Sequence, residues 1–267
     1  MEDVKLGFIG AGNIARAIIG GLISHGHAPS LIYAADPSAH QLAQLPDDIQ
    51  KLSANHRLVE QVDVVVICVK PDLVIPVATD FAPLARDKLI VSVAAGVTTA
   101  SIAGALGQDA AIIRCMPNTP ALVQTGMTGL YANGNVHDQQ KEIGRSMLAA
   151  VGKTAWLESE ADLDIVTAVS GSGPAYFFLV MEAMEAAATR LGLSTEMART
   201  LVLQTALGAA RMAIGSDDEA ATLRHNVTSK GGTTEAAINT LLDAGLPEDF
   251  DRAIEAAYRR SIELSGT

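Results

Sequence analysis

The sequence is poor in the residues that metal, redox and nucleophilic chemistry use most often. It has two cysteines, one tryptophan and 4% aromatic residues, and its cysteines and histidines do not have the spacing of a metal site. Cys68 and Cys115 both lie in apolar runs, so we expect reduced core residues rather than disulfide partners or metal ligands. Neither a Ser–His–Asp nor a Cys–His arrangement is indicated.

Basic charge is also scarce. The chain has 19 lysines and arginines against 30 acidic residues, which gives a net charge of −11. Nucleic acids and anionic membrane surfaces require clustered basic side chains, so the charge balance argues against both as partners. The N-terminal Met1-Glu2-Asp3 lacks the basic and apolar regions of a secretory signal. No apolar run is expected to reach the roughly 20 residues that span a bilayer, and the expected location is the cytoplasm.

The first half of the chain alternates short apolar segments with segments of helical composition. This pattern is typical of βαβ units around a parallel sheet, whose strands are buried on both faces. The predicted strands are Lys5–Ile9, Leu31–Ala35, Val64–Val69, Leu89–Val93, Ala111–Cys115, Gly129–Ala132 and Thr154–Leu157. The last two flank a helix at about Asp138–Ala150 and are expected as late edge strands of the same sheet.

After Glu158 the strand signals stop. The predicted helices there are Ala161–Gly192, Thr195–Ile214, a short one near Asp217–His225, Thr233–Asp243 and Pro247–Leu264. We therefore predict an α/β Rossmann-type domain at residues 1–159, followed by an all-helical domain at 160–267. Two of the helices are apolar on most faces, and a helical domain of this size has little interior to bury them. We expect them to pack against a second copy of the chain; burial against the first domain is the alternative.

The most informative motif follows the first strand. Residues 10–15 read Gly-Ala-Gly-Asn-Ile-Ala, and a helix of small residues comes next. Gly10 permits a tight turn, Gly12 lets a pyrophosphate approach the backbone, and Ala15 lets the helix lie close to the strand. The phosphates would then meet the free N–H groups at the helix N-terminus. An ordinary βα turn also contains glycine, but the strand before and the helix after favour a dinucleotide site.

Asp36 follows the second strand about twenty residues after this turn, where a carboxylate accepts hydrogen bonds from an adenosine ribose. A carboxylate there favours NADH, because it repels the extra phosphate of NADPH. No arginine follows within the next several residues to bind that phosphate. Asp-Pro is also a good helix start, so a role as N-cap of a helix near Pro37 is an equal alternative.

Three further loops are expected to face the cofactor, because ligands of such sheets bind across the carboxyl ends of the strands. They are residues 69–71 (Val-Lys-Pro), 94–96 (Ala-Ala-Gly) and 116–120 (Met-Pro-Asn-Thr-Pro). Lys70 could hold a ribose or phosphate, or be a solvated loop lysine. In the second half, Ser170–Tyr176 is a run of small residues within a helical segment, for which close structural packing is the favoured role.

The last notable stretch is Asn226–Glu235. Its glycines, at 231 and 232, expose backbone N–H groups at the start of the next helix, and its threonines supply hydroxyls. Such a loop suits a carboxylate, with a hydroxyl nearby for a polar ring atom. A flexible loop before an ordinary helix start explains the same residues equally well.

Taken together, these motifs resemble those of the pyrroline-5-carboxylate reductase family over the whole chain. The specific ones are Ser170–Tyr176 and Val227–Thr234, in this order near the end of an α/β-then-α chain. The resemblance implies reduction of the ring C=N bond of 1-pyrroline-5-carboxylate to L-proline with NADPH or NADH. It also implies a Rossmann domain followed by a helical dimerisation domain, with dimers often arranged into decamers.

The resemblance also assigns residues. It implies that Gly231, Gly232 and Thr233 bind the substrate carboxylate by backbone N–H groups, and that the Thr234 hydroxyl hydrogen-bonds the ring nitrogen. Thr234 is thus the predicted catalytic residue. Asn226 and Glu160 match positions near the substrate. The full set of predicted cofactor-binding residues is Ile9, Gly10, Ala11, Gly12, Asn13, Ile14, Asp36, Asn55, Val69, Lys70, Pro71, Ala95, Gly96 and Asn118.

Two positions depart from the family pattern. Lys230 stands where many members have proline, and Asp36 stands where small or basic residues accompany NADPH binding. The nearest rival is a β-hydroxyacid dehydrogenase, but that family places a catalytic lysine on its long helix. Here no lysine occurs between Lys153 and Lys230, which argues against it. A nicotinamide-sensing protein without turnover is the rival outside the enzymes, and a purely structural oligomer gives no reason for a dinucleotide turn.

Overall fold

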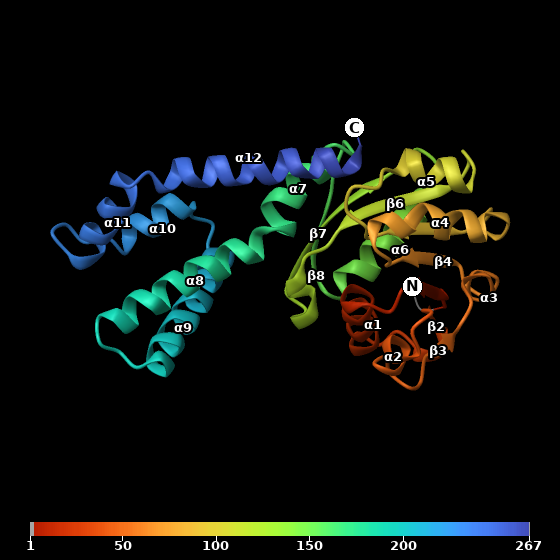
Figure 1. Cartoon of the computed structure of the whole chain (residues 1–267), viewed down its shortest axis with the longest axis horizontal. Helices are drawn as coiled ribbons and strands as arrows, with labels where there is room; N and C mark the ends of the chain where they lie inside the picture. Colours follow the sequence, from red (N-terminus) through yellow and green to blue (C-terminus); the bar gives the residue numbers. More distant parts are fainter. Residues whose placement is uncertain (1–2, 267) are drawn as a thin grey trace. The chain divides into compact units, whose positions relative to one another are not determined.

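Within residues 3–266, which the computed structural model describes, eight strands form one sheet in the order β3-β2-β1-β4-β5-β6-β7-β8 (Figure 1). The strands are β1 (Leu6–Ile9), β2 (Ile32–Ala35), β3 (Gln50–Leu52), β4 (Val64–Ile67), β5 (Leu89–Ser92), β6 (Ala111–Met116), β7 (Gly126–Ala132) and β8 (Gly152–Trp156). Neighbouring strands are parallel except β6 and β7. The order reverses between β1 and β4, so the loops after these strands lie where ligands of open α/β sheets bind.

Both faces of the sheet are covered, which explains the uninterrupted apolar strands. Along β4, alternate residues enter separate core clusters: Val64 and Val66 on one face, Val65 and Ile67 on the other. Helices α1 (Asn13–Ser24) and α6 (Asp138–Ala149) cover the first face with residues such as Ile18 and Leu148. Helices α3 (Asn55–Val59), α4 (Pro71–Phe81) and α5 (Thr99–Leu106) cover the second with residues such as Leu58 and Phe81. This is the predicted doubly wound α/β arrangement.

The remaining elements of this part are short. They are η1 (Pro29–Leu31), α2 (Ala39–Ala43), η2 (Ala82–Leu84), η3 (Thr119–Val123), α7 (Asp162–Val166) and the π-helical turn η4 (Thr167–Gly171). The later part of the chain is helical, with α8 (Gly173–Arg190), α9 (Thr195–Ile214), α10 (Ala220–Asn226), α11 (Thr233–Asp243) and α12 (Leu246–Ser265). Helices α8 and α9 are joined by a short turn and contact each other (Figure 1).

Contacts divide the described residues into two compact units. One contains the residues up to Ser172 together with those from Ala257 onward, and the other is Gly173–Ala256. Helix α7 packs with β6 and β7, where Val166 lies against Gly129, which explains why the first unit extends past residue 160. The division at residues 159 and 160 remains a prediction about the functional domains.

The predicted elements are present, with three differences. Strand β3 was not predicted, because this edge strand is three residues long and partly polar. Of the two late strands that were predicted as edge strands, only β8 lies at an edge of the sheet, whereas β7 lies inside it, antiparallel to β6. The predicted single helix Ala161–Gly192 is interrupted by the π-helical turn of η4, where Gly171 lies so close to Met116 that a Cβ would be 2.7 Å from its Cε. Gly171 thus packs closely, as predicted for this run, whereas a Cβ at Gly173 would have no atom within 4 Å.

Candidate functional site

The glycine turn after β1 has the geometry of a dinucleotide-binding loop. Gly10 has φ +95°, and a Cβ there would lie 2.7 Å from the carbonyl oxygen of Cys68, so only glycine fits. Gly12 is the N-cap of α1, and a Cβ there would have no atom within 4 Å. Ala15 is fully buried against the core. The backbone at Gly12 thus borders open space at a helix N-terminus, which fits the pyrophosphate of a dinucleotide.

Asp36 is fixed to the same loop. Its Oδ2 accepts a hydrogen bond of 2.8 Å from the Ala11 N–H, and its Oδ1 accepts one of 2.8 Å from the Ser38 N–H. Helix α2 begins at Ala39 with Ser38 as its N-cap, so Asp36 is not the cap of that helix. The carboxylate lies at the carboxyl end of β2, where the ribose-binding interpretation requires it.

A cavity of about 330 Å³ opens beside these residues. This volume is at the lower end of the range for small-molecule sites. Of the predicted cofactor residues, Ile9, Gly10, Asn55 and Val69 line it. The other lining residues were not predicted; they are Ala35, Pro37, Ser53, Ala54, His56, Leu73, Val77 and Asp80. The spacing of Leu73, Val77 and Asp80 places them on one face of α4, which was the available signal.

The remaining cofactor candidates occupy other loops. Lys70 is exposed and is the N-cap of α4, directly before Pro71. The side-chain amide of Asn118 donates to the carbonyl and hydroxyl oxygens of Ser170 at 3.2 and 3.3 Å, and its Oδ1 accepts from the Met127 N–H at 2.9 Å. Asn118 therefore ties the loop after β6 to the π-helical turn.

Glu160 belongs to a polar network. Its carboxylate accepts hydrogen bonds from the Thr99 N–H at 2.7 Å and from the Thr99 hydroxyl at 2.6 Å. It also forms an ion pair with Arg114 at 3.0 Å. The side chain of Arg114 is 4% exposed and that of Glu160 is 21% exposed. Thr99 begins α5, directly after the predicted cofactor loop that contains Ala95 and Gly96. The network thus fixes the helix that follows this loop.

The loop at residues 226–235 forms the start of α11. Gly231 has φ +71°, Gly232 is the N-cap, and the helix begins at Thr233. The Gly231 N–H donates to the Glu235 Oε2 at 2.7 Å, and the Gly232 N–H donates to the Ser229 carbonyl at 3.0 Å. The first-turn N–H groups of α11, which include those of Thr233 and Thr234, have no acceptor within the helix. Asn226 is exposed at the end of α10.

The titratable groups do not indicate thiol or metal chemistry. Cys68 and Cys115 are free, and burial raises the pKa of Cys68 to about 12 and that of Cys115 well above its usual value. Among residues 3–266, no group of three or more His, Cys, Asp or Glu side chains could hold a metal ion.

One helical stretch, Asp162–Arg190, is long and apolar enough to cross a membrane by length and composition. The expectation that no run reaches that length was therefore wrong, because the alanines and small residues of this segment carry little charge. Only 22% of its most apolar window is buried in the single chain, and one such helix is weak evidence for a membrane span.

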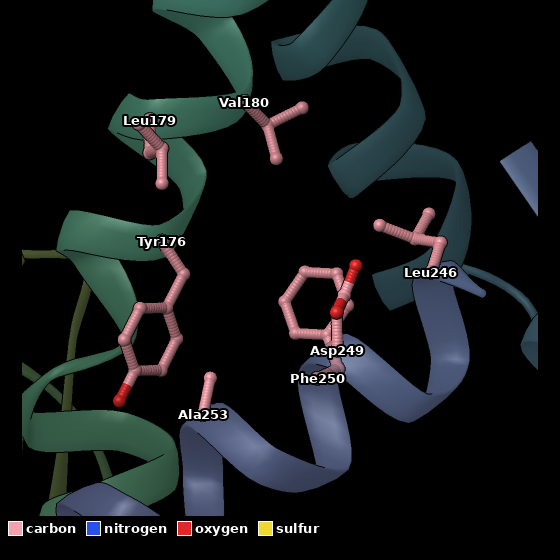
Figure 2. Close-up of a pocket in the computed structure, with 7 residues that line it drawn as sticks. All are labelled: Tyr176, Leu179, Val180, Leu246, Asp249, Phe250 and Ala253. Carbon is pink, nitrogen blue, oxygen red and sulfur yellow. The ribbon is translucent and has the colours of Figure 1, made fainter. Parts of the chain in front are cut away.

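The same region contains an apolar pocket of about 210 Å³ (Figure 2). Tyr176, Leu179 and Val180 of α8 line it from one side. Leu246, Asp249, Phe250 and Ala253 of α12 line it from the other. Beyond the pocket, Phe177 and Phe178 are 69% and 64% exposed. Large apolar side chains are thus exposed along α8 in the single chain, and an extended apolar surface is typical of an interaction site.

Comparisons with known proteins found matches for both the N-terminal and the C-terminal part of the chain. Residues 160–264 match a family model described as pyrroline-5-carboxylate reductase dimerisation. Residues 5–96 match one described as NADP oxidoreductase, coenzyme F420-dependent. A pyrroline-5-carboxylate reductase of Pseudomonas aeruginosa is 49% identical over 268 residues, with 99% of this chain and 98% of the relative covered.

Solved structures extend the likeness to three dimensions. A pyrroline-5-carboxylate reductase from Coxiella burnetii superposes with a TM-score of 0.95 at 42% identity, covering 99% of this chain and 100% of the other. A pyrroline carboxylate reductase from Plasmodium falciparum, with NADP bound, superposes with a TM-score of 0.90 at 31% identity, covering 99% of each chain.

Proposed function

This chain belongs to the pyrroline-5-carboxylate reductase family, and we infer that it reduces 1-pyrroline-5-carboxylate to L-proline with NADPH or NADH. The observation that carries the inference is the likeness to a reductase that is 49% identical over 268 residues, which covers 99% of this chain. The bound coenzyme supplies the hydride that reduces the ring C=N bond.

We assign the coenzyme to the cavity beside the glycine turn. The open backbone at Gly12 and the N-terminus of α1 suit the pyrophosphate, and Asp36 and Asn55 suit the adenosine end. The other predicted residues on this side are Ile9, Gly10, Ala11, Asn13, Ile14, Val69, Lys70 and Pro71. Ala95, Gly96 and Asn118 lie in the loops after β5 and β6, further along the same carboxyl edge of the sheet.

We assign the substrate carboxylate to the start of α11, where the backbone N–H groups of residues 231–234 and the helix dipole favour an anion. The Thr234 hydroxyl then orients the ring nitrogen and relays a proton to or from it. Because a protonated imine is already a good electrophile, positioning supplies much of the acceleration and no strongly perturbed acid is required. Asn226 remains a candidate for a contact near the ring.

Glu160 receives a different role. Three donors from Thr99 and Arg114 occupy its carboxylate, so we propose that it holds the start of α5 and the cofactor loop at 94–96. It would thus act as a positioning residue, and its predicted place near the substrate stays a prediction.

We further propose that the chain works as a homodimer, with decamers as a higher assembly. The match to a dimerisation model at 160–264 and the exposed apolar side chains of α8 and α9 support this. The apolar pocket between α8 and α12 belongs to the same unit and would be covered in the dimer (Figure 2). Burial against a second copy also accounts for the apolar stretch 162–190 without a membrane.

We also propose that the functional domains divide between residues 159 and 160, which the match to the dimerisation model at residues 160–264 supports. We propose a cytoplasmic location, supported by the two free cysteines, and no nucleic-acid or membrane partner, supported by the net charge of −11.

The test is oxidation of NADPH and of NADH, followed at 340 nm with and without 1-pyrroline-5-carboxylate. Oxidation that depends on the substrate and yields proline is expected. A folded, assembled protein that oxidises neither coenzyme would contradict the reductase function and favour a nicotinamide-sensing protein without turnover.

A further inference from the structure

Glu235 places a carboxylate on the loop that is assigned to the substrate carboxylate. Its Oε2 accepts a hydrogen bond of 2.7 Å from the Gly231 N–H, and this N–H is one of the donors assigned to the substrate. The positive φ of Gly231, +71°, makes the tight turn in which these two residues meet. A carboxylate of the protein itself therefore occupies part of the site that is assigned to the carboxylate of the substrate.

This contact differs from an ordinary helix cap. Glu235 is the third residue of α11, where a capping glutamate reaches back to the N–H of the N-cap residue. Here the N-cap residue, Gly232, donates its N–H to the Ser229 carbonyl at 3.0 Å instead. Glu235 reaches one residue further back, to Gly231. Its carboxylate therefore satisfies a loop amide rather than the helix terminus.

An incoming carboxylate would compete for the same donor. One N–H group makes one strong hydrogen bond, and two carboxylates cannot share it without like-charge repulsion. Glu235 is only half-buried, so its side chain can move to solvent when it is displaced. The first-turn N–H groups of Thr233 and Thr234 remain available throughout, because helix geometry gives them no internal acceptor.

We propose that Glu235 is an internal competitor of the substrate: it occupies the Gly231 N–H until the carboxylate of 1-pyrroline-5-carboxylate, or of proline, displaces it. The inference rests on the proposed function, since it requires that the loop binds this carboxylate. Glu235 thereby weakens the binding of substrate and of product.

A purely structural role predicts the opposite result. If Glu235 only stabilised the loop, its removal would disorder the site and raise KM. If it competes, its removal lowers both KM and the Kd of proline. The expected factor is about threefold to tenfold, the range that the net free energy of one hydrogen bond spans.

The experiment compares Glu235→Ala, Glu235→Asp and Glu235→Gln with the unaltered enzyme. Aspartate keeps the charge but is one methylene shorter, so it loses the reach to Gly231, whereas glutamine keeps the reach and loses the charge. Asp243→Asn is the matched control, because it removes one negative charge at the other end of the same helix. For each variant, KM for 1-pyrroline-5-carboxylate, kcat, and the Kd of proline by titration calorimetry are measured.

The proposal expects the alanine and aspartate variants to bind proline more tightly and to have a lower KM at the same kcat. The control Asp243→Asn should keep the KM, the kcat and the proline Kd of the unaltered enzyme. An aspartate variant that binds like the unaltered enzyme, or an alanine variant with the same or a higher KM, overturns the proposal. Unaltered enzyme that neither reduces the substrate nor binds proline overturns the proposed function and this inference with it.

Discussion

The carboxylate of Asp36 accepts a hydrogen bond of 2.8 Å from the Ala11 N–H, which joins the end of β2 to the glycine turn after β1. Its other oxygen accepts from the Ser38 N–H, so the negative charge is held in one place beside the coenzyme cavity. A fixed charge discriminates between ligands better than a mobile one, because no rearrangement can reduce its repulsion for a phosphate.

Asp36 is therefore expected to set the coenzyme preference. Asp36→Ser should raise the ratio of kcat/KM for NADPH to that for NADH about tenfold, which corresponds to about 1.4 kcal/mol. Steady-state rates with both coenzymes measure the ratio. The control is Glu60→Gln, an exposed charge at the end of α3. An unchanged ratio in the Asp36 variant would mean that this carboxylate only fixes the loop.

Thr234 is expected to act on the ring rather than on the coenzyme. Thr234→Val keeps the shape and removes the hydroxyl, and it should lower kcat/KM about 100-fold through lost orientation. Thr234→Ser should recover much of that loss. Coenzyme affinity, measured by quenching of NADPH fluorescence, should stay constant in both. Full kcat/KM in the valine variant would exclude the proposed proton relay.

The fold was largely predictable because its signals are local. The buried strand Val64–Ile67 is apolar throughout, and the glycine at position 10 marks the turn that its φ of +95° requires. Strand β3 was not predictable, because three residues at a polar edge carry no periodicity. The π-helical turn at Thr167–Gly171 lies against Met116, which is far away in the sequence, and no local pattern marks it.

The candidate site, like the fold, was predictable only where its signals are local in the sequence. Residues in motifs, such as Gly12 and Asp36, were found because turns and strand ends have recognisable sequences. Leu73 and Asp80 line the cavity only because α4 presents one face to it, and no motif marks them. The ties of Glu160 to Thr99 and Arg114 join residues that are distant in the sequence, so they could not be read from spacing.

Removal of one partner of the ion pair between Arg114 and Glu160 is expected to destabilise the fold strongly. Arg114→Met leaves a partly buried carboxylate without its cation, and the free energy of unfolding should fall by about 3 kcal/mol. The double variant with Glu160→Gln should lose less than the sum of the two single changes. Urea denaturation of the four proteins measures this coupling, and strict additivity would contradict it.

Stability should fall at alkaline pH because of the buried thiols. Burial raises the pKa of Cys68 from 9.0 to about 12, so between these values the unfolded chain has lost a proton that the folded chain keeps. Stability is then fully present below about pH 9 and declines as the pH rises towards 12. Urea unfolding at pH 8 to 10.5 should show a shallower decline for Cys68→Ala/Cys115→Val. Equal slopes in the two proteins would assign the decline to other groups.

The exposed apolar face of α8 is expected to hold the oligomer together. Phe178 is 64% exposed in the single chain, and Phe178→Asp would bury an unpaired charge if that face meets a second copy. Light scattering after size-exclusion chromatography should then show dissociation to smaller species, with helical circular dichroism retained. Val123→Asp is the control, because Val123 is 71% exposed but lies outside the matched dimerisation segment at 160–264. Dissociation by the control, or an intact assembly in the Phe178 variant, would place the interface elsewhere, and loss of activity that follows dissociation would show that the site needs the assembled form.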